Sequence, residues 1–435
     1  MKFKLAFLLF IFWLNAMFAQ SYIGHAVDNY SGVHGVVFNP ANVVGSAFKA
    51  DINIASGSGF FGSDYVDLGI ADILSEEFDF ENDMVTNPTD RNNFFGNVEI
   101  VGPSFMFNLN KKSSIGLISR ARAFYQINNI SGNLFENLID DFDTNEDFSF
   151  NSSNLRTNVH SWGEIGLAYG RILVSKQKHM LKAGVTLKYL LGAGSAFAST
   201  DNFQGQFFAN TETLETQGSV SYSTTSDFEG NFDTGDITSG FGLDLGMVYE
   251  YHPDRMDDNT RYFQDPYKLK VAVSVTDIGS INYENTEFTT YNLNSVADVS
   301  NIDDIQEFLD ENYPSTSEER TATIQLPTAL HFLVDYRVSK KFLVSAQANL
   351  AMSSQADQFA NRIINTLVLA PRLETKLFSL YAPISFREYG DTSFGAGLRF
   401  GPLSIGSGSV FSNLLSDNSR TTDLFVGLKI PVYRK

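Results

Sequence analysis

Residues 181–191 read LKAGVTLKYLL, and apolar and polar side chains alternate along them. Every odd position is apolar: Leu181, Ala183, Val185, Leu187, Tyr189 and Leu191. The even positions between them include Lys182, Gly184, Thr186 and Lys188. Because successive side chains of a β-strand point to opposite faces, this pattern predicts a strand with one apolar face and one polar face.

The same alternation returns in residues 240–251, 269–275, 342–350 and 424–432. A soluble β-sandwich also alternates, so the length of the stretches has to decide between the two architectures. Several of them run for ten to fifteen residues. Sandwich strands are typically about 5–6 residues long, whereas a tilted membrane-spanning strand needs about 9–11. The chain is therefore predicted to be all-β, a transmembrane antiparallel β-barrel.

The pattern predicts about fourteen strands, an even number as expected for a single-chain bacterial barrel. The expected strands are 51–61, 96–109, 113–126, 156–173, 179–192, 239–251, 267–279, 323–337, 341–352, 365–375, 377–386, 392–400, 402–411 and 422–433. Short connections such as 110–112 and 338–340 alternate with long ones such as 127–155 and 280–322, with one lapse at 252–266. Since outer-membrane barrels have short turns on the periplasmic side, both chain ends are expected in the periplasm.

The first twenty residues have the features of a signal peptide. Lys2 and Lys4 precede an apolar run over 5–14, and the small residue Ala19 stands before the expected cut. The expected organisation is a signal peptide over 1–20, an N-terminal hatch segment over 21–49 and a barrel with long extracellular loops over 50–435.

Composition narrows the class further. The formal net charge is -19, and it becomes -21 once Lys2 and Lys4 leave with the signal peptide, which argues against nucleic acid as a partner. Cysteine is absent, which excludes disulfides, thiol nucleophiles and thiolate metal sites. No apolar run after Gln20 is long enough for a transmembrane helix. These features predict a barrel in the outer membrane of a Gram-negative bacterium, with outer-membrane lipid as its surroundings.

The polar face of the strands is expected to look into the lumen. The lumen-facing residues predicted from the register are Arg120, Arg122, Glu164, Lys182, Lys188, Asp244, Glu250, His331, Asp335, Arg337, Arg372, Glu374 and Arg399. A lipid-facing Arg or Lys at mid-membrane would cost about 2–4 kcal/mol, so the confinement of charge to one face supports this register. Two interpretations stay open: the mixed charges pair across the lumen and stabilise it, or they line a polar conduit.

The segment before the first strand contains Asn39, Pro40, Ala41 and Asn42. Asn is a good helix cap and Pro suits the first helical position, so a short helix over 40–46 is expected. Such a helix is too small to fold alone, and we expect it to be packed in the barrel as a hatch.

The expected outer loops are acidic and aromatic, and residues 134–142 and 302–313 have helix-like apolar spacing. They would either cap the barrel or form a surface for a partner. Residues 141–152 match a calcium loop poorly, because Glu146 stands where the turn glycine belongs. No Gly-x-Ser-x-Gly motif is present. The sequence therefore predicts no catalytic residue, no metal and no cofactor.

Two parts of the chain carry a family resemblance. Residues 28–35 with Asn39 to Asn42, and then 48–53, resemble the opening of a family of uncharacterised outer-membrane barrels. Residues 240–251 and 326–330 are similar to strand openings in the same group. That group looks distantly related to the long-chain fatty-acid transporters and to accessory barrels of the type IX secretion system.

The resemblance implies a hatch-plugged barrel that passes hydrophobic or amphipathic small molecules. The alternative function is a scaffold without transport activity, whose outer loops hold secreted or surface proteins. An outer-membrane hydrolase ranks last, since nothing in the sequence points to one.

Overall fold

The fold is described by a computed structural model over residues 22–67, 85–140, 142–225, 238–255, 266–300, 302, 305–355, 357, 359–388, 392–416 and 419–434. The expected signal peptide therefore lies outside the described residues. The helical elements are α2 (Val33–Phe38), η2 (Pro40–Val43), α4 (Gly132–Ile139), α5 (Ile305–Asn312) and α6 (Val410–Leu415). No described helix combines the length and the apolarity needed to cross a membrane.

The described strands are β1 (Phe48–Ser63), β2 (Val66–Asp67), β3 (Val85–Thr86), β4 (Asn92–Val101), β5 (Ser104–Asn108), β6 (Ser113–Ile130), β7 (Phe148–Lys176), β8 (His179–Phe208), β9 (Thr213–Thr224), β10 (Thr238–Tyr251), β11 (Leu269–Asn292), β12 (Ser295–Asp298), β13 (Ser315–Gln325), β14 (Ala329–Arg337), β15 (Phe342–Ala351), β16 (Thr366–Glu374), β17 (Phe378–Tyr381), β18 (Ile384–Arg387), β19 (Thr392–Phe394), β20 (Ala396–Phe400), β21 (Leu403–Ser407) and β22 (Thr421–Tyr433).

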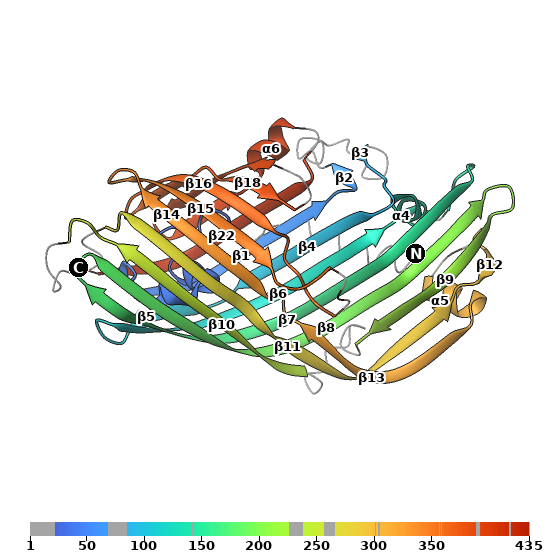
Figure 1. Ribbon diagram of the computed structural model, residues 1–435, viewed down its shortest axis with the longest axis horizontal. Coiled ribbons are helices and arrows are strands. Elements are labelled where there is room, and N and C mark those ends of the chain that lie inside the picture. Colours follow the sequence, from blue (N-terminus) through green and yellow to red (C-terminus); the bar gives the residue numbers. More distant parts are fainter. Residues whose placement is uncertain are drawn as a thin grey trace.

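All of these strands except β2 and β3 belong to one antiparallel sheet, which closes into a barrel (Figure 1). The last strand β22 pairs with β1, and β1 pairs with β4 and β5 on its other side. Three barrel strands are interrupted, so β4 continues as β5, β17 as β18 and β19 as β20. Counted in this way, the described residues form fourteen barrel strands, and the prediction of a fourteen-strand barrel is confirmed.

Apolar side chains cover the outside of the barrel, as the alternation predicts. Leu187 and Tyr189 on β8 are exposed, while Lys182 and Lys188 on the same strand are buried. On β10, Phe241 is 75% exposed and Asp244 is buried. A water-soluble protein would not expose such a continuous apolar belt, and a barrel immersed in lipid requires one.

Several strand boundaries differ from the prediction. The strands expected over 156–173, 179–192 and 267–279 were placed too short, because they are β7, β8 and β11 and continue into the connections expected to be long loops. The expected strand 323–337 is two strands, β13 and β14, separated at Pro327, which has no N–H to donate to a sheet. The expected strand 402–411 ends at Ser407, because Asp423 accepts hydrogen bonds from the Gly408 N–H (2.6 Å) and the Ser409 hydroxyl (2.9 Å) and the chain turns into α6.

One end of the barrel is much taller than the other. Strands β7 and β8 contain 29 and 30 residues, about three times what a membrane crossing needs. Their upper parts join β9, β12, β13 and the upper part of β11 in a sheet that projects beyond the barrel, which we call the platform. Figure 1 shows the platform at the end of the barrel opposite the C-terminus. The short connections lie at the C-terminal end. By the rule for outer-membrane barrels, the platform end is expected to be extracellular.

The N-terminal segment, residues 22–47, lies inside the barrel at the short-turn end. It carries α2 and the 3-10 helix η2, which is shorter than the helix expected over 40–46. Glycines of the wall make room for it: a Cβ on Gly184 would lie 2.4 Å from the backbone of Pro40 and Ala41, and one on Gly246 would lie 2.1 Å from Asn39.

Candidate functional site

The structure places the thirteen predicted lumen residues with their side chains in the barrel interior. His331 and Arg337 are half-buried, and the other eleven are buried. Arg337 lies at the short-turn rim, where its guanidinium donates to the backbone oxygens of Tyr267 and Lys340. His331 bonds to Thr276 and Asn349 on the neighbouring strands.

Seven side chains form a central ion cluster across the middle of the lumen. Its members are Glu99, Arg120, Arg122, Glu164, Lys188, Asp244 and Asp277, from β4, β6, β7, β8, β10 and β11. Asp277 joins the cluster together, with oxygens 2.9 Å from Arg122 Nη1 and 2.6 Å from Lys188 Nζ. Arg120 lies 2.9 Å from Glu99 and donates to Glu164 at 2.6 Å. The predicted charges thus pair with one another, as the first of the two interpretations has it.

The sequence reasoning missed two members of this cluster. Glu99 has the inward parity of β4, so the alternation contained the signal for it. Asp277 breaks the alternation of inward and outward side chains along its strand. The reason is a β-bulge in β11 opposite Leu243–Leu245, where Asp277 adopts a left-handed φ of 59°. The bulge turns both Thr276 and Asp277 inward. A period-two pattern cannot reveal such a residue.

Buried ionic contacts hold the N-terminal segment to the wall. Asp28 accepts from Arg399 Nε at 2.9 Å and from the Tyr381 hydroxyl. The Asn29 side chain donates to Glu374 at 2.7 Å and accepts from Lys270 at 2.8 Å. These contacts reach β11, β16, β17 and β20, so they attach the segment to several sides of the barrel.

Two buried histidines lie next to Asp28 in this segment. The rings of His25 and His34 are 5.1 Å apart. His34 Nε2 lies 2.9 Å from the Ser56 hydroxyl, and His25 Nδ1 lies 3.2 Å from the Tyr381 hydroxyl. Burial lowers the pKa of His34 to about 3 and holds the pKa of His25 well below its usual value. Both rings are therefore neutral at pH 7.

The four residues predicted to form the hatch lie against strands β8 and β10. The Asn39 side chain accepts from the Ala41 N–H at 3.0 Å and so caps η2. It also donates to the backbone oxygen of Val273 at 3.1 Å. Asn42 donates to Gly35 O at 2.8 Å, which ties η2 to α2. Pro40 and Ala41 are buried.

Above the central ion cluster, buried apolar side chains pack together inside the barrel, beside a few buried polar ones. We call this region the aromatic chamber; its buried members are Phe60, Phe95, Phe124, Trp162, Leu190, Phe197, Ile281, Tyr283, Phe288, Ala322, Ile324, Leu326 and Ile364. Arg122 marks its floor, with its guanidinium 5.1 Å from the ring centre of Phe124 and 5.0 Å from that of Trp162. The sequence reasoning did not identify the chamber, because these inward positions interrupt the polar face with aromatic residues.

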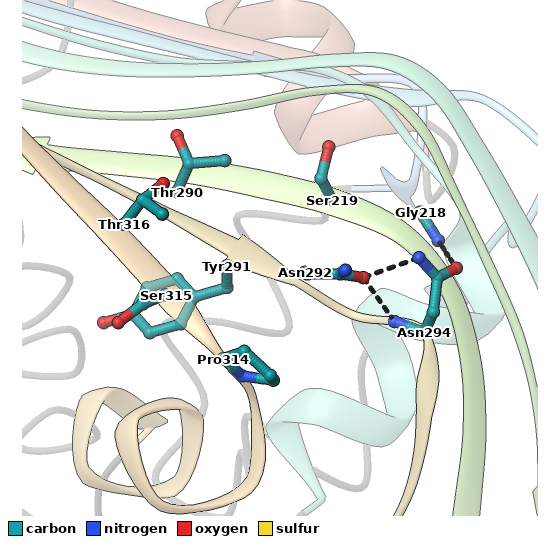
Figure 2. A pocket seen from close by; sticks show the side chains of 9 residues that line it. All are labelled: Gly218, Ser219, Thr290, Tyr291, Asn292, Asn294, Pro314, Ser315 and Thr316. Atoms are coloured by element: carbon teal, nitrogen blue, oxygen red, sulfur yellow. Dashed lines mark hydrogen bonds between the residues drawn. The ribbon is translucent and has the colours of Figure 1, made fainter.

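The platform carries two shallow recesses on its surface. The first has a volume of about 510 Å³ and is lined by polar residues of β9, β11 and β13, including Ser219, Thr290 and Thr316 (Figure 2). The second, of about 660 Å³, lies on β7, β8, β9 and β12. Both include Asn294, which Figure 2 shows bonded to Asn292 and Gly218. Neither recess opens into the lumen residues described above.

A family model described as a family of unknown function, DUF5723, matches residues 40–408. The chain belongs to this family. The matched range of the DUF5723 protein starts at Pro40 in the N-terminal segment and includes the whole central ion cluster. No curated protein shows significant sequence similarity to it.

The DUF5723 protein is similar to solved outer-membrane transporters at low sequence identity. A FadL homologue of Pseudomonas aeruginosa is 11% identical, with a TM-score of 0.47 over 95% of this chain and 97% of that one. The toluene transporter TbuX of Ralstonia pickettii is 8% identical, with a TM-score of 0.42 over 92% of this chain and 94% of that one.

Proposed function

We propose that this DUF5723 protein is an outer-membrane channel for hydrophobic or amphipathic small molecules, and that residues 22–47 act as its hatch. The observation that carries the proposal is the aromatic chamber inside the barrel. Channels for ions and hydrophilic solutes have polar interiors. An interior lined by Phe60, Phe124 and Trp162 suits an apolar solute instead.

The way in which the N-terminal segment is held supports its role as the hatch. It fills the short-turn end of the lumen without being part of the barrel wall. Its contacts are ion pairs, hydrogen bonds, a buried apolar cluster that includes Val33 and Val36, and a close fit against Gly184 and Gly246. Such contacts can be broken and remade without unpairing any barrel strand. The wall would stay closed while the segment moves.

The test is deletion of residues 22–46 from the mature chain, expressed in Gram-negative cells. Uptake of N-phenylnaphthylamine, an apolar dye that an intact outer membrane excludes, is measured beside uptake of a hydrophilic dye of similar size. The proposal expects faster uptake of the apolar dye only. Equal acceleration of both dyes would indicate an unselective pore, and no acceleration of either would argue against a channel.

The platform supports a second candidate function, a scaffold for secreted or surface proteins. Its long strands project well beyond the barrel and offer two recesses lined mostly by polar side chains, with Glu215 in the second. A photo-crosslinking residue at Ser219 in the platform, compared with one at Ser339 in a short turn, tests it in native membranes. If the protein is a scaffold, one stoichiometric adduct should form at Ser219 and none at Ser339. If it is a channel without partners, no adduct should form at either position.

A further inference from the structure

We propose that residues 359–365, in the connection between β15 and β16, form a second gate that closes the lumen from the extracellular side. The proposal rests on the proposed channel function. It adds the place at which a solute would enter from outside and the segment that it would have to displace. The connection leaves the rim at the platform end, and its described residues fold into the barrel instead of lying over it.

The connection crosses the whole lumen. It starts on β15 and ends on β16, and it has polar contacts with β6 and β7. In the order of the fourteen barrel strands, β6 is the third from β1 and β16 the tenth, so they are half a turn apart around the barrel. A segment that joins opposite walls in this way divides the lumen.

Asn361 is the first anchor on the opposite wall. It is fully buried, and its side-chain N–H₂ group donates to His160 Nδ1 at 2.6 Å and to the backbone oxygen of Gln325 at 2.9 Å. Its side-chain oxygen accepts from Asn158 at 3.1 Å. One residue of the connection thus bonds to β7 and to the end of β13.

Arg362 and Gln126 form the second anchor. The Gln126 side chain donates to the backbone oxygen of Arg362 at 2.6 Å and accepts from its N–H at 3.2 Å, a reciprocal pair to β6. The Arg362 guanidinium turns back to Glu388 beyond β18, at 2.6 Å. A further pair of backbone bonds, from Gln325 N to Phe359 O and from Asn361 N to Gln325 O, holds the connection in place.

The apolar side chains of the connection occupy the aromatic chamber. Phe359 packs edge-on against Phe197, with ring centres 5.2 Å apart, and against Phe288 at 5.9 Å. Ile363 and Ile364 belong to the same apolar cluster. An apolar solute in the chamber would occupy the space that these side chains fill, so entry from outside requires the connection to move.

The anchors to the opposite wall are neutral hydrogen bonds, whereas the N-terminal segment is held by ion pairs. Neutral bonds exchange with water at little net cost, about 0.5–1.5 kcal/mol each. A solute that replaces the apolar contacts of Phe359 and Ile363 can therefore break the bonds to β6 and β7, while the ion pair between Arg362 and Glu388 stays in place. The two closures differ in this respect.

The absence of cysteine makes the gate directly testable. A single cysteine at Leu190, buried in the chamber, is labelled by an externally added maleimide in the full chain and in a variant whose residues 354–364 are replaced by a Gly-Ser linker. The proposal expects labelling at least ten-fold faster in the linker variant. A cysteine at exposed Ser219 serves as the control and should react equally in both. Equal labelling of the Leu190 cysteine would overturn the gate.

A second experiment holds the gate closed. Asn158→Cys and Asn361→Cys are bridged by a short bifunctional thiol reagent in the variant that lacks residues 22–46. Apolar dye uptake should fall at least five-fold and return on reduction, while the single Asn158→Cys variant is unaffected. Undiminished uptake in the bridged variant overturns the gate. If no variant takes up dye and labelling at Leu190 still depends on the connection, the channel function fails and the closure stands.

Discussion

Asp28 is the residue on which the attachment of the N-terminal segment depends most. Its carboxylate is fully enclosed and accepts from both Arg399 and Tyr381. A buried ion pair contributes little net stability compared with an apolar pair of the same size, but removing one partner leaves the other charge buried without compensation. The side chain thus controls whether residues 22–47 stay in the barrel, while the barrel strands depend on their own pairing.

The first prediction concerns the substitution Asp28→Asn, which removes the negative charge beside Arg399. Loss of the charge should weaken docking of the N-terminal segment by about 3–5 kcal/mol, which corresponds to a 100-fold or greater increase in its released fraction. The measurement is the maleimide reaction rate of a cysteine introduced at Val36, which is buried in the segment. Glu318→Gln, which removes a charge from an exposed ion pair, is the matched control and should change the rate less than two-fold. Equal rates in both variants would contradict the role of Asp28.

The second prediction concerns acidification. Because burial lowers the pKa of His34 to about 3 and holds that of His25 well below its usual value, the released segment binds protons below pH 6.5 more readily than the docked one. Docking is therefore strongest above pH 6.5 and weakens as the pH falls, by roughly 2 kcal/mol at pH 5 for His34. Nearby Asp28 keeps its charge in this range, since its pKa is itself lowered by Arg399.

The thiolate is the reactive form of a cysteine and becomes scarcer as the pH falls, so each rate is divided by that of a cysteine at exposed Ser219 at the same pH. The rate ratio of the Val36 cysteine should be higher at pH 5 than at pH 7, and His34→Gln should reduce this pH dependence. A ratio that is the same at both pH values with both histidines present would show that the buried rings do not control docking.

At the scale of elements, the 3-10 helix η2 is held by a shape match with the barrel wall. The backbone of Pro40 and Ala41 passes so close to β8 that only glycine fits at position 184, and the Asn39 side chain lies equally close to Gly246 on β10. Close backbone approach is a known reason for glycine inside a strand. The barrel wall therefore has a recess for this helix, which exists because glycine has no side chain.

The third prediction is that Gly184→Val displaces η2. Its Cβ would lie 2.4 Å from backbone atoms of Pro40 and Ala41, which cannot rotate away. Overpacking of this kind typically costs about 1–3 kcal/mol. Apolar dye uptake should rise at least five-fold, whereas Gly163→Val, whose Cβ would meet nothing closer than 3.8 Å, should leave uptake unchanged. The same uptake in both variants would argue against the recess for η2.

At the scale of the whole molecule, two environments divide the outer surface. The barrel belt faces lipid, and the platform faces water. Leu187 on the belt and Val296 on the platform are each 60% exposed, so solvent exposure alone does not distinguish them. Their different surroundings follow from their distance along the strands from the short turns.

The fourth prediction uses this pair. Leu187→Arg should destabilise the membrane-inserted barrel by about 2–4 kcal/mol, the cost of a charged side chain in the hydrocarbon core. Val296→Arg should change stability by no more than about 0.5 kcal/mol. The measurement is urea-dependent folding into detergent or lipid, followed by the heat-modifiable mobility of the barrel in gel electrophoresis. Similar stabilities for the two variants would show that Leu187 does not contact lipid.

Much of the architecture could be predicted because it depends on local pattern. The alternation at Leu181–Leu191 predicts both the strand and the inward direction of Lys188, since the period of two is a property of the strand itself. Asn39 and Pro40 likewise predict the start of η2. The mixed charges of the inward face predict that ion pairs form in the lumen, but they do not predict which residues pair.

Only the tertiary structure decided which side chains meet across the lumen. Asp277 points into the ion cluster because of a bulge in β11, and Asn361 reaches β7 because closure of the barrel brings the opposite wall within range. Neither residue differs in local pattern from one that faces solvent. Side-chain direction along a strand follows from the adjacent residues, whereas contacts between opposite walls exist only once all fourteen strands have closed.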